Sequence, residues 1–321
     1  MDWIHQTKIA VTTSTFVIVS TLHAATWHVD DDGVDYPNAD FSSIQESINA
    51  ASDGDEIFIY SGVYTLPEAT SGPVIDIDNK QLTLTGVGEV SISGRGERRC
   101  FQSSNMSSQQ SLITGLDFTD GSSGVGGGVY CDLSSPVFVN CTISNCGAQT
   151  NGGGVYLTES FAEFHNCEIV DNTASGSLLA EGGGFYTIEG APLLIDCLVQ
   201  GNTSHGSVFS KGGGIRVASG DLTLVSSRIE LNTASSDVSL ISGGGLSTDT
   251  ARTTSVDVVY CQNTPDHQNG LVSPASGNVY AFLCQDSDGD GLPDEASQVG
   301  DGVHLVPSEF ATIQQAIEAA G

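Results

Sequence analysis

The sequence predicts an all-β protein built as a parallel β-solenoid, and three observations support this fold class. A glycine triplet recurs through the middle of the chain at a nearly constant spacing. Each recurrence is followed by short runs in which apolar and polar residues alternate, which is the pattern of strands rather than helices. The composition agrees, since 39 of the 321 residues are Gly and only 2 are Met.

The first 25 residues are typical of a secretory signal peptide. A short polar start with Lys8 precedes the apolar stretch IAVTTSTFVIVSTLHAA, which ends in small residues at Ala24 and Ala25. The stretch is too short to span a bilayer comfortably, so an uncleaved anchor is the weaker alternative. No later segment approaches transmembrane length. The sequence therefore predicts bacterial-type export, to the cell surface or into the medium.

The charge balance excludes one class of partner. Nine Lys and Arg stand against 39 Asp and Glu, which gives a formal net charge of -30. Such a chain repels nucleic acids and anionic membrane surfaces, so we predict no nucleic-acid partner. Two interpretations of the acidity stay open. It keeps an exposed β surface soluble, or it serves a cationic partner or bound calcium.

A short capping helix is predicted before the first full strand. Ile44, Ile48 and Ala51 form one apolar face in the stretch 40–64. The first turn offers two alternative capping boxes, Ser42 with Gln45 and Ser43 with Glu46. An open stack of strands needs such a cap, because its end otherwise pairs with another chain. The runs 56–60, 74–78, 81–86 and 90–94 then supply the first coils.

Five glycine triplets define the repeat. Their last residues are Gly128, Gly154, Gly184, Gly214 and Gly245, so the spacings are 26, 30, 30 and 31 residues. Aligning the repeats on these glycines gives further columns of like residues. These columns are Val129, Val155, Phe185, Ile215 and Leu246; Phe138, Phe164, Leu194 and Leu224; Cys141, Cys167, Cys197 and Ser227; and Asn172, Asn202, Asn232 and Asn263. We expect each column to stack at the strand spacing of about 4.8 Å.

The residue types in these columns suit a stacked coil. An Asn at a repeated turn takes a left-handed conformation easily and hydrogen-bonds to the Asn of the next coil. Glycines allow a sharp bend where a Cβ would collide. The column of Cys141, Cys167 and Cys197 permits either disulfides or a ladder of reduced thiols, and both stay open.

The repeat motifs resemble those of a known superfamily. They are GGGVY at 126–130 and 152–156, GGGFY at 182–186, NCEIVDNTA at 166–174 and DCLVQGNTS at 196–204. Over residues 110–264 the chain resembles pectin-lyase-like proteins with a right-handed parallel β-helix, and specifically the polymorphic outer-membrane-protein type of repeat. The resemblance implies one such β-helix over residues 26–285 of a bacterial surface protein.

Two further segments are predicted after the β-helix. Residues 286–300 contain DSDGDGLPDE, which resembles thrombospondin type 3 and EF-hand-like calcium loops. Its predicted Ca²⁺ ligands are Asp286, Asp288, Asp290 and Asp294. The alternative is a flexible acidic linker, because Ser297 stands where an EF-hand has a bidentate Glu. Residues 301–321 repeat the opening of the chain, FATIQQAIEAA matching FSSIQESINAA, and predict a second, truncated β-helix module. A lone closing helix is the alternative.

The candidate binding residues follow the glycine triplets. Tyr130, Tyr156, Tyr186 and Arg216 alternate with inward residues and are therefore expected to point outward. In the enzymes that the chain resembles, this face carries the polysaccharide cleft, so we predict that the four residues bind a polysaccharide or cell-surface glycan. The alternative is an aromatic ladder that only supports parallel pairing.

Catalysis is the rival function, and no catalytic residue is assigned. Glu159 and Glu189 fall in equivalent positions, about 5 Å apart by strand spacing, which suits a glycosidase pair. The bases that a lyase of the resembled superfamily needs, such as Lys211, Arg216 and Arg228, are dispersed along the chain. The leading hypothesis is therefore structural, adhesive or glycan-binding, with recognition by the variable loops 173–181, 203–211 and 233–242. A polysaccharide lyase or glycoside hydrolase is the alternative.

Overall fold

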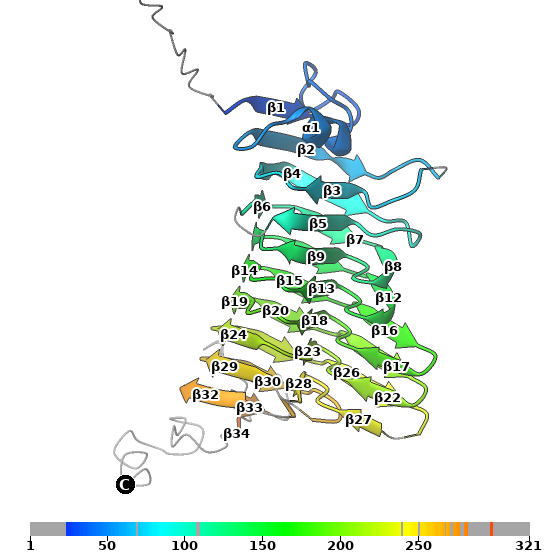
Figure 1. Ribbon diagram of the computed structural model, residues 1–321, viewed down its shortest axis with the longest axis vertical. Coiled ribbons are helices and arrows are strands. Elements are labelled where there is room, and N and C mark those ends of the chain that lie inside the picture. Colours follow the sequence, from blue (N-terminus) through cyan, green and yellow to red (C-terminus); the bar gives the residue numbers. More distant parts are fainter. Residues whose placement is uncertain are drawn as a thin grey trace, which may run out of the picture.

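The computed structural model describes residues 24–68, 70–106, 110–238, 240–249, 251–266, 268–269, 272–276, 279–281 and 296–297. Within them the chain forms a right-handed parallel β-helix with one short helix at its N-terminal end (Figure 1). The predicted fold class is confirmed.

The N-terminal cap consists of β1 (Thr26–Val29), α1 (Ile44–Ala50) and the start of β2 (Glu56–Tyr64). Ser43 is the N-cap of α1, and its side chain accepts a hydrogen bond from the Glu46 N–H. The buried Ile44 and Ile48 pack onto the first coil. Of the two predicted capping boxes, the second therefore supplies the N-cap.

Eighteen strands form a long sheet, to which most turns contribute two. Besides β1 and β2, it contains β4 (Thr83–Ser93), β6 (Leu112–Thr114), β7 (Asp117–Thr119), β10 (Val137–Val139), β11 (Thr142–Ser144), β14 (Glu163–His165), β15 (Glu168–Val170), β19 (Leu193–Ile195), β20 (Leu198–Gln200), β24 (Asp221–Val225), β25 (Arg228–Glu230), β29 (Arg252–Val256), β30 (Val259–Cys261), β32 (Val272–Ser276), β33 (Val279–Ala281) and β34 (Ala296–Ser297). The predicted runs 81–86 and 90–94 form one continuous strand, β4.

A second sheet, here called the tyrosine sheet, takes one strand from each turn. It contains β3 (Ile75–Asp78), β5 (Phe101–Met106), β9 (Val129–Ser134), β13 (Val155–Thr158), β18 (Phe185–Ile188), β23 (Ile215–Val217), β28 (Leu246–Thr248) and β31 (Gln268–Asn269). The strands from β3 to β28 lie one below another at the centre of Figure 1.

The third sheet, here called the arm sheet, lies at the right of Figure 1. It contains β8 (Ser122–Val125), β12 (Gly147–Asn151), β16 (Thr173–Gly176), β17 (Leu179–Glu181), β21 (Thr203–Gly206), β22 (Phe209–Lys211), β26 (Thr233–Ser236) and β27 (Leu240–Ser242). β12 pairs with β16 at Ala148 and with β17 at Asn151. The extra length of the 30-residue repeats therefore lies between β16 and β17. The predicted variable loops are ordered strand pairs, which we call arms.

The strands stack in the predicted register. Phe138 pairs with Phe164, then Leu194, then Leu224, and all four side chains are fully buried. The pairs between successive turns are parallel; β33 with β34 is the antiparallel exception among the described strands. One column of core residues per turn is what the repeat alignment requires.

The asparagine column forms a buried hydrogen-bonded ladder. Asn202 Oδ1 accepts from both the backbone N–H and Nδ2 of Asn172, at 2.9 and 3.0 Å, and the same pattern joins Asn202 to Asn232 and Asn232 to Asn263. The expected left-handed conformation falls on the preceding residue instead, since Asp171 has φ 55° and Gly201 φ 67°. That residue makes the bend, which leaves the ladder Asn free to point into the core.

The glycine triplets bend the chain where no side chain fits. A Cβ on Gly153 would lie 2.4 Å from the carbonyl oxygens of both Thr173 and Gly183. Gly152, one residue earlier, has φ 63°. The cysteine column nearby contains buried free thiols, so the structure has the reduced ladder rather than disulfides at Cys141, Cys167 and Cys197.

Candidate functional site

The tyrosine sheet positions the predicted binding residues in one column. Tyr130 pairs with Tyr156, Tyr156 with Tyr186, and Tyr186 with Arg216 in successive strands. All four side chains point away from the core, because they alternate with the buried residues of the same strands. Tyr130 and Tyr156 are half-buried, whereas Tyr186 and Arg216 are buried at 5% and 3% exposure. The structure therefore brings the four together, with less exposure at the Arg216 end than the sequence indicates.

The three tyrosine rings stack face to face. Their centroids lie 5.5 Å apart between Tyr130 and Tyr156 and 5.0 Å apart between Tyr156 and Tyr186, with interplanar angles of 7° and 9°. The guanidinium carbon of Arg99 lies 4.3 Å from the centroid of Tyr130, which is a cation–π contact. The ring faces are thus largely used within the protein, and a ligand meets the edges of the rings.

The ring edges carry the phenol hydroxyls. Within the described part of the chain, these three hydroxyls have no hydrogen-bond partner, and they are absent from its buried unpaired polar atoms. Each hydroxyl oxygen therefore keeps some exposure to solvent, although Tyr186 as a whole is only 5% exposed, and the three lie in a row that follows the axis of the β-helix. Each hydroxyl can donate one hydrogen bond and accept others, which suits a ligand rich in hydroxyl groups.

The electrostatic surroundings keep the phenols protonated. Burial raises the pKa of Tyr130, and the charge of Asp132 on the same strand raises it further. Burial and then the charge of Glu181 raise the pKa of Tyr186 to about 12. All three hydroxyls are consequently neutral donors at physiological pH.

An apolar column on the arms borders the tyrosine column. Leu179 pairs with Phe209 and Phe209 with Leu240, and their exposed fractions are 40%, 47% and 49%. Leu179 lies two residues before Glu181 and hence on the same side of β17. Glu181 Oε1 lies 3.4 Å from Arg216 Nε. The arm column and the tyrosine column are therefore parts of one surface, which we call the tyrosine face.

Charged residues join the two columns. Lys211 Nζ lies 2.9 Å from Asp249 Oδ1, and Arg216 Nη2 lies 2.5 Å from Asp249 Oδ2. Burial opposes ionisation of Asp249, but hydrogen bonds from Arg216 and Lys211 outweigh it and lower the pKa of this carboxyl. Two of the bases that are dispersed in the sequence thus converge on one carboxylate. Asp249 and Glu181, which hold Arg216 in place, carry no sequence motif that marks them.

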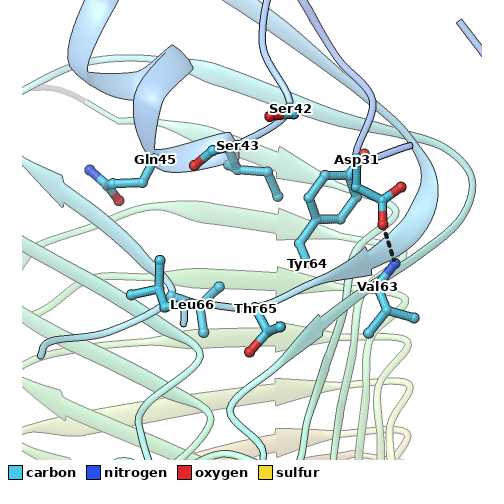
Figure 2. A pocket seen from close by; sticks show the side chains of 10 residues that line it. Asp31, Ser42, Ser43, Gln45, Val63, Tyr64, Thr65 and Leu66 are labelled. Carbon is cyan, nitrogen blue, oxygen red and sulfur yellow. Dashed lines mark hydrogen bonds between the residues drawn. The ribbon is translucent and has the colours of Figure 1, made fainter. Parts of the chain in front are cut away.

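The cavity shown in Figure 2 is too small for a polymer. It lies between α1 and the first coil, has a volume of about 80 Å³, and is lined by Tyr64, Thr65 and the Asp31 carboxylate, among others. The Val63 N–H donates to Asp31 Oδ2 at 3.3 Å across its edge. Ligand pockets are usually several times larger. A wider, open groove of about 630 Å³ lies over β2, β4 and β7 and is lined by Val63, Glu89 and Asp117, among others.

The predicted glycosidase pair lies on a turn. Glu159 and Glu189 both have positive φ, 47° and 56°, and both are exposed. They follow the paired Thr158 and Ile188 in neighbouring turns, as expected from the repeat. Their position at the turn accounts for their recurrence without any catalytic role, because the chain bends at each of them.

Several predictions lie outside the described residues. They concern most of the signal peptide, the calcium ligands Asp286, Asp288, Asp290 and Asp294, and the segment 301–321. These stay predictions. Among the helices that the structure does describe, none has the length and apolarity to cross a membrane.

Comparisons with known proteins agree with the fold. The model of the family described as "Right handed beta helix region" matches residues 101–220. Among solved structures, pectate lyase Pel9A is similar with a TM-score of 0.55 and 12% identity, over 78% of this chain and 68% of that protein. A pectin methylesterase from carrot aligns over 83% of this chain and 90% of its own, with 14% identity and a TM-score of 0.39. No curated protein matches the sequence significantly. At such identity the likeness to the pectate lyase shows the fold alone.

Proposed function

We propose that the protein is exported and binds a polysaccharide along its tyrosine face, in a surface or adhesive role and without turning the polymer over. The observation that carries this proposal is the row of three unpaired phenol hydroxyls, spaced by one coil each and bordered by an exposed apolar column. Sugars present hydroxyl groups at their edges and C–H groups on their faces. The two columns offer a partner for each.

Periodicity supports a polymeric ligand over a small one. The hydroxyl row repeats at the rise of the β-helix, about 4.8 Å, which is close to the length of one sugar unit in an extended glycan. A polymer that lies along the axis repeats its contacts at each coil. Binding then gains from several weak contacts at once, which is how repeat proteins use an extended surface.

The alternative is a polysaccharide lyase or glycoside hydrolase, and the fold shared with a pectate lyase favours it. The bases of the tyrosine face do not strengthen it, because Lys211 and Arg216 are both paired with Asp249. Reducing-end and unsaturated-product assays on the polymers that bind separate the two proposals. Turnover of any of them would replace the binding proposal by the enzymatic one.

Binding to the tyrosine face is tested by substitutions that spare the fold. Tyr156→Phe and Tyr186→Phe remove only the hydroxyls and keep the ring stack, so each is expected to weaken binding about 2- to 10-fold on a glycan array. Phe209→Ala removes an exposed ring of the arm column. Its matched control is Phe161→Ala, at 60% exposure in the connection between β13 and β14 and outside the arm column. Equal effects of the two alanine variants would contradict the proposed site.

A further inference from the structure

The Arg99 guanidinium on the tyrosine face is held by partners within the chain. Its Nε donates to the carbonyl oxygen of Gly126 at 2.8 Å, and its Nη2 to that of Val125 at 2.8 Å. Nη2 also donates to Ser123 Oγ at 3.1 Å, and Nη1 donates to Gln102 Oε1. A guanidinium has five N–H groups, so Arg99 has little left to offer to an anionic ligand.

The other two cations of this face are paired with carboxylates. Lys211 and Arg216 share the carboxylate of Asp249, as described above. Arg216 is further held by Glu181 Oε1 and by the Ser247 carbonyl oxygen, each at 3.4 Å. Its side chain is only 4% exposed. Lys211 is more exposed, at 30%, but its ammonium group already contacts both oxygens of the Asp249 carboxylate.

Two carboxylates on the same face, Asp132 and Asp78, have no ion-pair partner among the described residues. Asp132 follows Tyr130 by two residues on β9 and therefore points to the same side. Asp78 occupies the matching outward position two strands earlier, because Asp78 pairs with Ser104 and Ser104 with Asp132. Two carboxylates without ion pairs therefore lie beside the Tyr130 end of the hydroxyl row.

We infer that the glycan bound by the tyrosine face is uncharged, an inference that rests on the proposed function. The face donates hydrogen bonds through neutral phenols, packs through Phe209, and holds its cations by contacts within the protein. A polyuronate brings one carboxylate per sugar close to Asp132 and Asp78, while the cations of this face already have partners within the protein. A neutral polymer meets the same groups without this repulsion, so the surface discriminates by charge against acidic polymers.

Native gel electrophoresis of the full chain through dissolved polymers tests the inference. The panel contains neutral glucans, galactans and xylans beside polygalacturonate and alginate. A methyl-esterified pectin and the same pectin after de-esterification form a pair with one backbone, in which neutral methyl esters are replaced by carboxylates. We expect one or more neutral polymers to retard the protein, and the esterified pectin to bind about tenfold more tightly than its charged partner at low salt. The difference narrows in about 0.5 M salt, because exposed charges are screened there.

A charge variant shows whether the preference for the esterified pectin arises from the carboxylates of the tyrosine face. Asp132→Asn is expected to narrow the gap between the two pectins, whereas Asp117→Asn, which removes an equal charge from the outer face of β7, leaves it unchanged. Both variants must unfold at the wild-type temperature. Equal or tighter binding of the acidic polymers overturns the inference and leaves the proposed function standing. If no polymer of either kind binds, the proposed function fails and the inference fails with it.

Discussion

The asparagine ladder is expected to contribute strongly to the free energy of unfolding, and the single substitution Asn202→Ala tests this. Asn202 is fully buried. The substitution removes the acceptor of the Asn172 N–H and of Asn172 Nδ2, and the donor to the Ile169 carbonyl oxygen at 2.7 Å. These three buried groups lose a partner, at about 1–3 kcal/mol each. A fourth group, Asn232 Oδ1, loses the Asn202 Nδ2 donor but keeps the Asn202 N–H. One water entering the space can satisfy two of them, so we expect a destabilisation of about 3–5 kcal/mol.

Equilibrium unfolding in guanidinium chloride, followed by circular dichroism, measures this loss. A loss of about 3 kcal/mol raises the unfolding constant more than hundredfold. Hydrogen exchange of the peptide 166–174 should show the Asn172 amide losing protection in the variant. The control is Asn166→Gly, which removes an exposed Asn–Asn hydrogen bond of 2.7 Å at a residue with φ 51° that glycine accepts. A variant Asn202→Ala within 1 kcal/mol of the wild type, with its Asn172 amide still protected, would refute the reasoning.

Three further predictions test other parts of the structure. Gly153→Ala places a Cβ 2.4 Å from two carbonyl oxygens and should destabilise by about 1–3 kcal/mol in the same unfolding assay, whereas Gly124→Ala, with nothing within 4 Å, should be neutral. Burial of Asp55 opposes its ionisation, but hydrogen bonds from the Ser52 and Ala25 N–H groups and the Trp27 indole outweigh burial and lower the pKa of this carboxyl in the folded state. The stability that ionised Asp55 contributes is therefore fully present above the pKa of the unfolded chain, about 3.9. It is lost as the pH falls through the lower pKa of the folded state. Acid titration of tryptophan fluorescence should show this loss in the wild type and not in Asp55→Asn; the same acid dependence in both would contradict it. Calorimetric titration with Ca²⁺ should show one binding site, and Asp288→Asn should lower its affinity. The same affinity in the wild type and in Asp288→Asn would contradict the predicted ligand set.

The repeat could be predicted from the sequence because each column is set by one local requirement. Cys141, Cys167 and Cys197 fall in register because every turn has to fill the same interior volume. The same residue type recurring at a nearly constant spacing therefore indicates one equivalent core position in each turn. The left-handed residue of the asparagine turn was misplaced by one position. Asn, Asp and Gly all tolerate that conformation, so residue type alone does not distinguish Asn172 from Asp171.

The binding face could be predicted only in part. The alternation of side chains along a strand shows which residues point outward, but it does not show which of them are accessible to solvent. It placed Tyr186 and Arg216 outward correctly, yet both are buried by contacts that depend on tertiary structure. Arg216 is covered by Glu181 from the arm and by Asp249 from a later turn. The arms pair as strands only when neighbouring turns supply partners, so a loop of variable length in the sequence gives no sign of the ordered apolar column that it forms.

The sequence leaves two interpretations of the tyrosine column open, glycan binding and support of the parallel strand pairing, and the stacked rings are compatible with both. A ladder that only stabilises the sheet uses the ring faces, and a ladder that only binds sugars presents them to the ligand. With centroids 5.0 and 5.5 Å apart, the faces serve the sheet while the hydroxyls stay open to solvent. Stabilisation and binding therefore reside in different atoms of the same residues. Tyr156→Phe keeps the ring stack and removes one of the three hydroxyls, whereas Tyr156→Ala removes both the ring and the hydroxyl. Comparing the two variants in unfolding and binding assays therefore separates the contribution to stability from the contribution to binding.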